Sequence, residues 1–173
     1  MTAEQAHTRY VLRGAPHLAP GGMSPFINDA HIDLGYRYRS AAIFTEAGDD
    51  GVITEDPRQM RGRPGTRLPH LMIERGGALV SSIDLVDSGF ALFAGPDAAN
   101  WSRAADRAAR AAGLACPAFE LGDACDAVGV SPSGAVLVRP DGVVAWRSVD
   151  AATDPESMMA RVFAAMVGRR QGI

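Results

Sequence analysis

The stretch that most restricts the fold of this chain is residues 134–147, where two apolar runs flank a short polar turn. The turn reads Pro140-Asp141-Gly142, in which proline presets its own φ and glycine accepts a positive φ. Two apolar runs joined by such a turn are typical of two antiparallel strands. The sequence therefore predicts a β-hairpin over these residues.

A strand, a helix and a second strand are expected before the hairpin. Residues 89–94 form a short apolar run that suits a central strand buried on both faces. The helix that follows has Asp97 as its N-cap and Gly113 as a left-handed terminating residue. Residues 114–121 are the next apolar run. One stripe of the helix carries its apolar side chains: Trp101, Ala105, Ala108 and Ala112.

A last helix is expected after the hairpin. It begins with a capping box at residues 153–156 and ends at Gly168. The order is then strand, helix, strand, hairpin and helix, which gives a mixed sheet with helices on both faces. We therefore predict the α/β class, with a thioredoxin-like mixed sheet and flanking helices. The apolar face of the last helix holds Met158, Met159, Val162, Phe163, Met166 and Val167.

The amino-terminal part of the chain has a different character. Residues 1–35 are rich in proline, glycine and histidine without an apolar period, which indicates an irregular arm. Residues 36–44 alternate tyrosines with arginines and end in an apolar run, which predicts a strand. We accordingly divide the chain into an arm, residues 1–35, and a thioredoxin-like domain, residues 36–173.

A long loop without an apolar period follows, at residues 46–70. Loops of this length are uncommon inside a compact domain unless they are functional or contact a partner. Two further strands are expected at residues 71–73 and 78–85, joined by Arg75-Gly76-Gly77.

Charge and composition exclude several functional classes. The 173 residues include 17 basic side chains, all arginine, against 20 acidic ones, for a net charge of −3. A weakly acidic single domain is a poor general binder of nucleic acid. Residues 1–10 lack the apolar run of a signal peptide, and proline interrupts the longest charge-free stretches, so no membrane span is expected. We therefore expect a cytoplasmic protein.

Cysteine and histidine usage argues against redox and metal chemistry. The helix after the central strand begins at residues 95–101 without a cysteine, so the thiol pair of a redox thioredoxin is missing. Cys116 and Cys125 are expected to be packing residues, and they do not have the spacing of a zinc site. The four histidines are not paired with other ligands at helical spacing, so no metal site is predicted.

The sequence does not assign a catalytic residue, but it offers three candidates. His31 and Asp33 lie two residues apart in the arm, where an extended backbone would turn both the same way as a base and its orienter. Their alternative role is that of solvated arm residues. His70, in a loop held by Pro64, Gly65 and Pro69, is the third candidate.

Five residues are candidates for a binding site or an interface. Arg67, beside His70, either clamps a carboxylate or phosphate or pairs with Asp84. At the end of the hairpin, Trp146 is expected in the core and Arg147 as a surface stacker or interface residue.

Several segments together resemble one family in order and spacing. They are residues 34–42, 63–70, 82–85, 89–95 and 134–147, and they resemble the carboxy-terminal domain of FAD-dependent aromatic-ring hydroxylases, which act on phenols, chlorophenols and aromatic polyketides. The resemblance implies a thioredoxin-like domain without redox cysteines that packs on flavin and substrate domains and contributes to dimer contacts. FAD and NAD(P)H serve the amino-terminal part of such enzymes. This chain has no Gly-x-Gly-x-x-Gly sequence, so we expect no flavin site of its own.

Three functions remain open at this point. The first is an accessory domain of a flavin monooxygenase, with a flavoprotein partner. The second is a free-standing enzyme or binder of an aromatic small molecule in polyketide biosynthesis, with the interdomain face as its pocket. The third is a homodimerisation module. For each, the arm and the long loop carry apolar residues that need a cover, so we expect both to meet a partner or a ligand.

Overall fold

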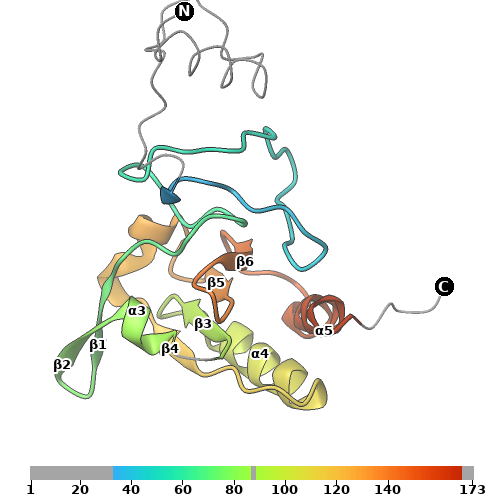
Figure 1. Ribbon diagram of the computed structural model, residues 1–173. Helices are drawn as coiled ribbons and strands as arrows, with labels where there is room; N and C mark the ends of the chain where they lie inside the picture. Colours follow the sequence, from blue (N-terminus) through green and yellow to red (C-terminus); the bar gives the residue numbers. More distant parts are fainter. Residues whose placement is uncertain (1–32, 87–88, 169–173) are drawn as a thin grey trace, which may run out of the picture.

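The computed structural model describes residues 33–86 and 89–168 (Figure 1). The predicted arm lies almost entirely outside these residues, and His31 lies outside them too. The division of the chain at residue 35 therefore stays a prediction.

A four-stranded mixed sheet forms the centre of the molecule. Its strands are β3 (Ala91–Ala94), β4 (Ala118–Glu120), β5 (Ala135–Val138) and β6 (Val144–Ser148), in the order β4-β3-β5-β6. β3 pairs parallel with β4 and antiparallel with β5, which pairs antiparallel with β6. Gly142 occupies the hairpin turn at a φ of 77°. The predicted hairpin and the α/β mixed sheet are confirmed.

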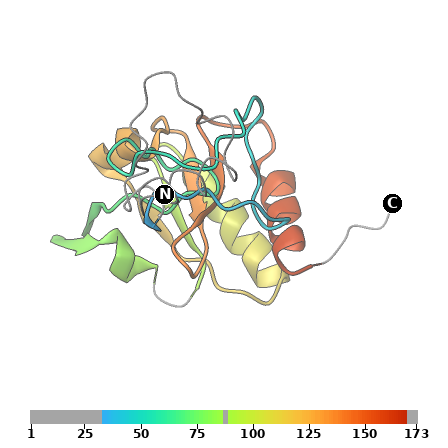
Figure 2. The ribbon, with the colours of Figure 1, turned by 45° about the horizontal axis from the view of Figure 1, so that its top comes forward.

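Both long helices cover the same face of this sheet. They are α4 (Ala99–Ala111) and α5 (Pro155–Met166), which lie side by side in Figure 2. Trp101 of α4 and Phe163 of α5 are fully buried against Leu92 of β3 in one apolar cluster. Both long helices thus lie on one face and shorter helices lie on the other, which agrees with the expected helices on both faces. None of the helices that the structure describes is long and apolar enough to cross a membrane.

Shorter elements cover the opposite face. A 3-10 helix, η2 (Gly122–Val128), packs there with a separate two-stranded sheet, β1 (Met72–Arg75) and β2 (Ala78–Ser81). A one-turn helix, α3 (Ser82–Leu85), follows β2 directly. The second apolar cluster contains side chains from all of these except β2, whose Val80 packs against its edge.

The strand expected at residues 78–85 ends at Ser81, which is a correction. The Ser81 hydroxyl accepts a hydrogen bond from the amide of Ile83 and caps α3. The buried Ser82 hydroxyl accepts from the amide of Leu71 at 3.0 Å. Two serines in sequence thus favour a cap over a continued strand, because their side chains compete for backbone amides.

Helix ends follow the expected chemistry with shifts of one residue. Asp154 caps α5 by accepting from the amide of Ser157, whereas the predicted box begins at Thr153. Gly113 and Gly168 have positive φ as expected. Asp97 is not an N-cap, because its amide donates to the carbonyl of Pro132 and the helix begins after Ala98.

The strand predicted at residues 36–44 does not form. Only Tyr36 makes a bridge, with Thr54, and the amide of Tyr38 then donates to the carbonyl of Gly65. Residues 65–68 run along the outer edge of β6 and exchange backbone hydrogen bonds with Val144 and Gly142. The long loop therefore pairs with a sheet edge that would otherwise be open to another chain.

Candidate functional site

A buried arginine organises the segment that precedes the long loop. Arg37 has 3% of its surface exposed, and its guanidinium donates to Asp49, to Asp50 at 3.2 Å and to the carbonyl of Val52 at 3.0 Å. Glu55 lies 3.6 Å from its Nε. A buried cation needs such partners, because its desolvation is otherwise costly.

Two further arginines complete an arginine–carboxylate cluster, defined here as Arg37, Arg39, Arg63, Asp49, Asp50 and Glu55. Arg63 contacts Asp50 and Glu55, both at 2.8 Å. Its hydrogen bonds lower the pKa of Asp50 to about 2, and the Arg37 guanidinium lowers the pKa of Asp49. The cluster holds residues 49–55 against residues 37–39 and 63.

The depressed pKa values of these aspartates predict an acid dependence. A carboxyl with a lower pKa in the folded chain stabilises that state when ionised, so its contribution is present above the unfolded pKa of about 4 and is lost as the pH falls toward 2. We expect the free energy of unfolding to fall over that window, and to fall less in Asp49→Asn. Urea unfolding at several pH values measures this. Asp106→Asn, which removes an exposed i,i+4 pair with Arg110, is the surface control for the substitution itself. Equal slopes for the wild type and Asp49→Asn would contradict the assignment.

Arg147 fastens the long loop to the sheet. Its Nε and Nη2 donate to the two carboxylate oxygens of Glu46 at 2.6 and 2.8 Å, and its Nη1 donates to the carbonyls of Arg61 and Val128. This guanidinium therefore has intramolecular partners, and a surface stacking role is left without support. Trp146 is buried, as expected of a core residue, and the centroids of its ring and the Trp101 ring are 4.7 Å apart.

Arg67 is exposed and lines a small pocket with Leu68, Ile83 and Pro140. Among the described residues it has no ion-pair partner, and Asp84, which is also exposed, does not pair with it. Its antiparallel bridge to Val143 fixes its backbone on the edge of the sheet.

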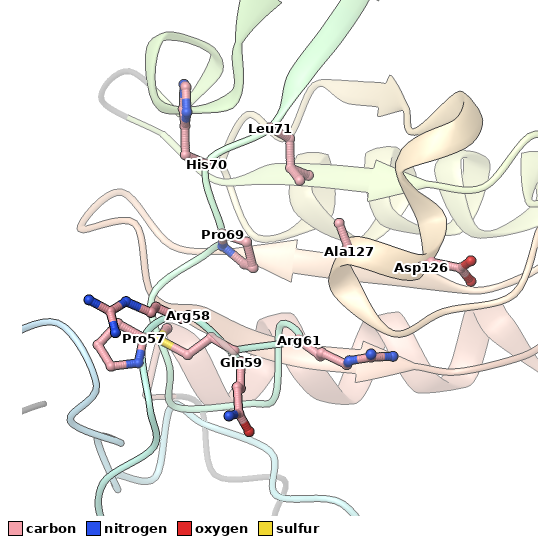
Figure 3. Close-up of a pocket in the computed structure, with 10 residues that line it drawn as sticks. Pro57, Arg58, Gln59, Arg61, Pro69, His70, Leu71, Asp126 and Ala127 are labelled. Atoms are coloured by element: carbon pink, nitrogen blue, oxygen red, sulfur yellow. The ribbon is translucent and has the colours of Figure 1, made fainter.

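His70 lines a different cleft, of about 920 Å³, with Arg58, Arg61 and Asp126. Figure 3 shows Arg58 and Arg61 pointing in opposite directions and His70 pointing away from both. The His70 Nε2 lies 3.1 Å from the Ser81 hydroxyl. These side chains do not converge on one point, which acid-base catalysis requires.

The candidates from sequence are thus spread over the molecule. Arg67 and His70 line separate pockets, Asp33 is exposed, and its expected neighbour His31 lies outside the described residues. In the described ranges, 33–86 and 89–168, no three His, Cys, Asp or Glu side chains gather as a metal site would require. Arg37 was not among the candidate residues predicted from the sequence. The acidic run that begins at Asp49 was the signal that a buried arginine could have carboxylate partners.

The cysteines are placed for packing. Burial raises the pKa of Cys116 to about 12 and also raises the pKa of Cys125. Only a thiolate is an effective nucleophile.

We therefore expect both thiols to resist iodoacetamide at neutral pH in the folded chain and to react fully in denaturant. Mass spectrometry of the two peptides checks this, and the denatured sample is the control. Rapid modification of Cys116 in the folded chain would contradict the assignment.

With this geometry in place, comparison with known proteins decides the family. The family model described as "Aromatic-ring hydroxylase, C-terminal" matches residues 61–169. The chain belongs to this family. It is 37% identical over 182 residues to the 4-methyl-5-nitrocatechol 5-monooxygenase of Burkholderia sp., covering 98% of this chain and 33% of the monooxygenase. It is 35% identical to the aklavinone 12-hydroxylase RdmE of Streptomyces purpurascens, with the same coverage.

Solved structures of hydroxylases also resemble this aromatic-ring hydroxylase domain. Aklavinone-11 hydroxylase, in a ternary complex with FAD and aklavinone, has a TM-score of 0.78 and 33% identity, over 96% of this chain and 32% of that one. The flavin-dependent monooxygenase PieE has a TM-score of 0.70 and 29% identity, over 98% and 31%. The chain therefore spans about a third of the length of these relatives, of which the two solved hydroxylases are in complex with FAD.

The residues present do not fit FAD. In dinucleotide-binding folds, a glycine-rich turn and free amides at a helix N-terminus hold the pyrophosphate. Here the turn before α4 contains Gly95, where an added Cβ would collide with the carbonyl of Pro132. The amides of Asp97 and Ala98 already donate to the carbonyls of Pro132 and Gly95. The two amides that precede this helix are thus paired within the chain, and the chain has no Gly-x-Gly-x-x-Gly sequence.

Proposed function

We propose that the chain serves as the accessory carboxy-terminal domain of an FAD-dependent aromatic or polyketide hydroxylase and does not itself carry out the oxygenation. The observation that carries this proposal is the family match to a carboxy-terminal domain, together with the lack of a Gly-x-Gly-x-x-Gly sequence in the chain. The polar candidates line separate pockets, which favours this role over that of a free-standing enzyme.

Such a domain contributes by holding other parts of the enzyme in position, without reacting groups of its own. The two-sided core around β3 and β5 makes a rigid body, and Arg147 and the arginine–carboxylate cluster fasten the preceding segment to it. A rigid domain of this kind limits the movement of whatever it packs on and keeps water from the contact. The reacting groups belong to the flavoprotein part of the relatives.

The remaining assignments follow from this role. We propose Arg67 and His70 as residues at the edge of the contact with the flavoprotein part, where a charge-assisted hydrogen bond is favourable. A homodimer contact, an aromatic substrate held by the assembled enzyme and a cytoplasmic location are part of the same proposal.

A chimera tests the proposal. The chain would replace the matching third of the 4-methyl-5-nitrocatechol 5-monooxygenase, with which it shares 37% identity. We expect the chimera to retain FAD and to hydroxylate the substrate of the parent enzyme. The parent lacking that third should lose FAD or activity. The proposal is contradicted if this truncated parent works as well as the intact one.

A further inference from the structure

In one short segment, the apolar side chains are exposed to solvent and the charged side chain is buried. Along residues 34–38, the side chains of Leu34, Tyr36 and Tyr38 are 42–50% exposed, whereas the intervening Gly35 and Arg37 are buried. The rings of Tyr36 and Tyr38 lie together, with centroids 5.1 Å apart. The segment therefore exposes its large apolar side chains and buries the charge of Arg37.

The paired segment also exposes apolar side chains. Val52 and Ile53 are 46% and 40% exposed, while their backbone carbonyls accept hydrogen bonds from Arg37. We call the exposed side chains of Leu34, Tyr36, Tyr38, Val52 and Ile53 the tyrosine ledge. It holds five of the nine large hydrophobic residues that are exposed among those described.

Ion pairs of Arg37 and Arg63 and the hydrogen bond from the Tyr38 amide to the Gly65 carbonyl attach the ledge to the domain. Single exposed apolar residues on a surface need no explanation, but these five lie on two segments joined by the bridge between Tyr36 and Thr54. The exposed side chains of Arg39 and Asp50 border the ledge. An apolar centre with a charged rim is the usual composition of a protein–protein contact.

The position of the ledge indicates what covers it. The family match begins at residue 61, so the ledge comes directly before the carboxy-terminal domain in the chain. Since the family is the carboxy-terminal part of longer hydroxylases, the other two thirds of the relatives precede it. Figure 1 shows residues 34–54 on the far side of β6 from α4. The backbone that carries the ledge thus lies away from the helical layer, close in sequence to residue 33, the first residue that the structure describes.

We propose that the tyrosine ledge is the docking surface for the flavin- and substrate-binding part of the hydroxylase. This inference rests on the proposed accessory function and adds the face through which it acts. Tyr36 and Tyr38 form the centre of the contact, and Arg37 positions them from behind without touching the partner.

Chemical labelling tests this first on the chain alone. We expect tetranitromethane to nitrate Tyr36 and Tyr38 in the folded chain at any protein concentration. If both are protected and deletion of residues 1–32 restores their reactivity, the chain covers its own ledge and the proposal is overturned. Protection that grows with protein concentration points to a second copy and overturns it equally.

The same labelling of the chimera then separates the two proposals. We expect a chimera that retains FAD to lose nitration at Tyr36 and Tyr38, while Met72, exposed on the β1–β2 hairpin, stays open to peroxide oxidation. If FAD is retained but both tyrosines react as in the chain alone, the docking surface is wrong and the accessory function stands. If FAD is not retained, the accessory function fails and the ledge with it.

Substitution gives a second measurement. Ile53→Ser should lower the FAD retained by the chimera and leave the unfolding of the chain alone unchanged. Leu79→Ser, on the exposed face of the hairpin, is the matched control and should change neither. Equal FAD retention in both variants overturns the proposal.

Discussion

Replacing Arg37 by methionine should lower the free energy of unfolding by about 3–5 kcal/mol, as expected when one partner of a buried ion pair is removed. The side chains of Asp49 and Glu55 are only 12% and 13% exposed. Without the Arg37 guanidinium, their charged carboxylates would be largely buried with no central cation between them. Methionine keeps the apolar stem, so the loss reports the guanidinium. Chemical denaturation measures it.

Arg39→Met is the matched control for this substitution. Arg39 is half exposed and reaches the same Asp49 at 3.5 Å, so its loss should cost less than about 1 kcal/mol. If both variants lose the same stability, the cluster acts as an ordinary surface network, and the segment before the loop is held by something else.

Substituting Gly65 by alanine should also be strongly destabilising, by about 2–5 kcal/mol, because backbone strain and a steric clash add. Its φ is 93°, and an added Cβ would collide with the carbonyl oxygen of Tyr38. That carbonyl belongs to a rigid crossing, since the amide of Tyr38 donates to the carbonyl of Gly65 at 2.8 Å. Thermal or urea unfolding of the variant provides the measurement.

Gly76→Ala separates the two causes. Gly76 has a φ of 59° with nothing within 4 Å of an added Cβ, so alanine there should cost only the left-handed strain, about 1–2 kcal/mol. If Gly65→Ala lowers the free energy of unfolding no more than Gly76→Ala does, the backbone segments at residues 38 and 65 move apart at little cost.

The carboxy-terminal half of the fold was predictable because its signals are local. The turn at Pro140-Asp141-Gly142 and the terminating Gly113 act on their own backbone, and apolar runs of strand length report burial. The choice of sheet face for α5 is a tertiary matter, decided by the packing of Phe163 against the elements around it. The sequence therefore predicts helices on both faces but does not assign α5 to the face that it shares with α4.

The amino-terminal half was less predictable because its contacts are distant in sequence. Arg37 finds its carboxylates 12 to 18 residues away, and Arg147 finds Glu46 at a separation of 101 residues. Alternation separated Tyr36 and Tyr38 from the buried Arg37, whereas Arg39 is exposed like the tyrosines. Polarity suggested no reason for Arg37 to be the buried residue. Only the location of the carboxylates in space decides that.

If the chain is an accessory domain, FAD is bound by another part of the enzyme and not by this chain. Equilibrium dialysis of the purified chain against FAD measures this. We expect no FAD to be retained above the dialysis background, whereas the chimera binds the cofactor under the same conditions. Stoichiometric FAD on the chain alone would contradict the accessory role, because the chain has no Gly-x-Gly-x-x-Gly turn to hold the pyrophosphate.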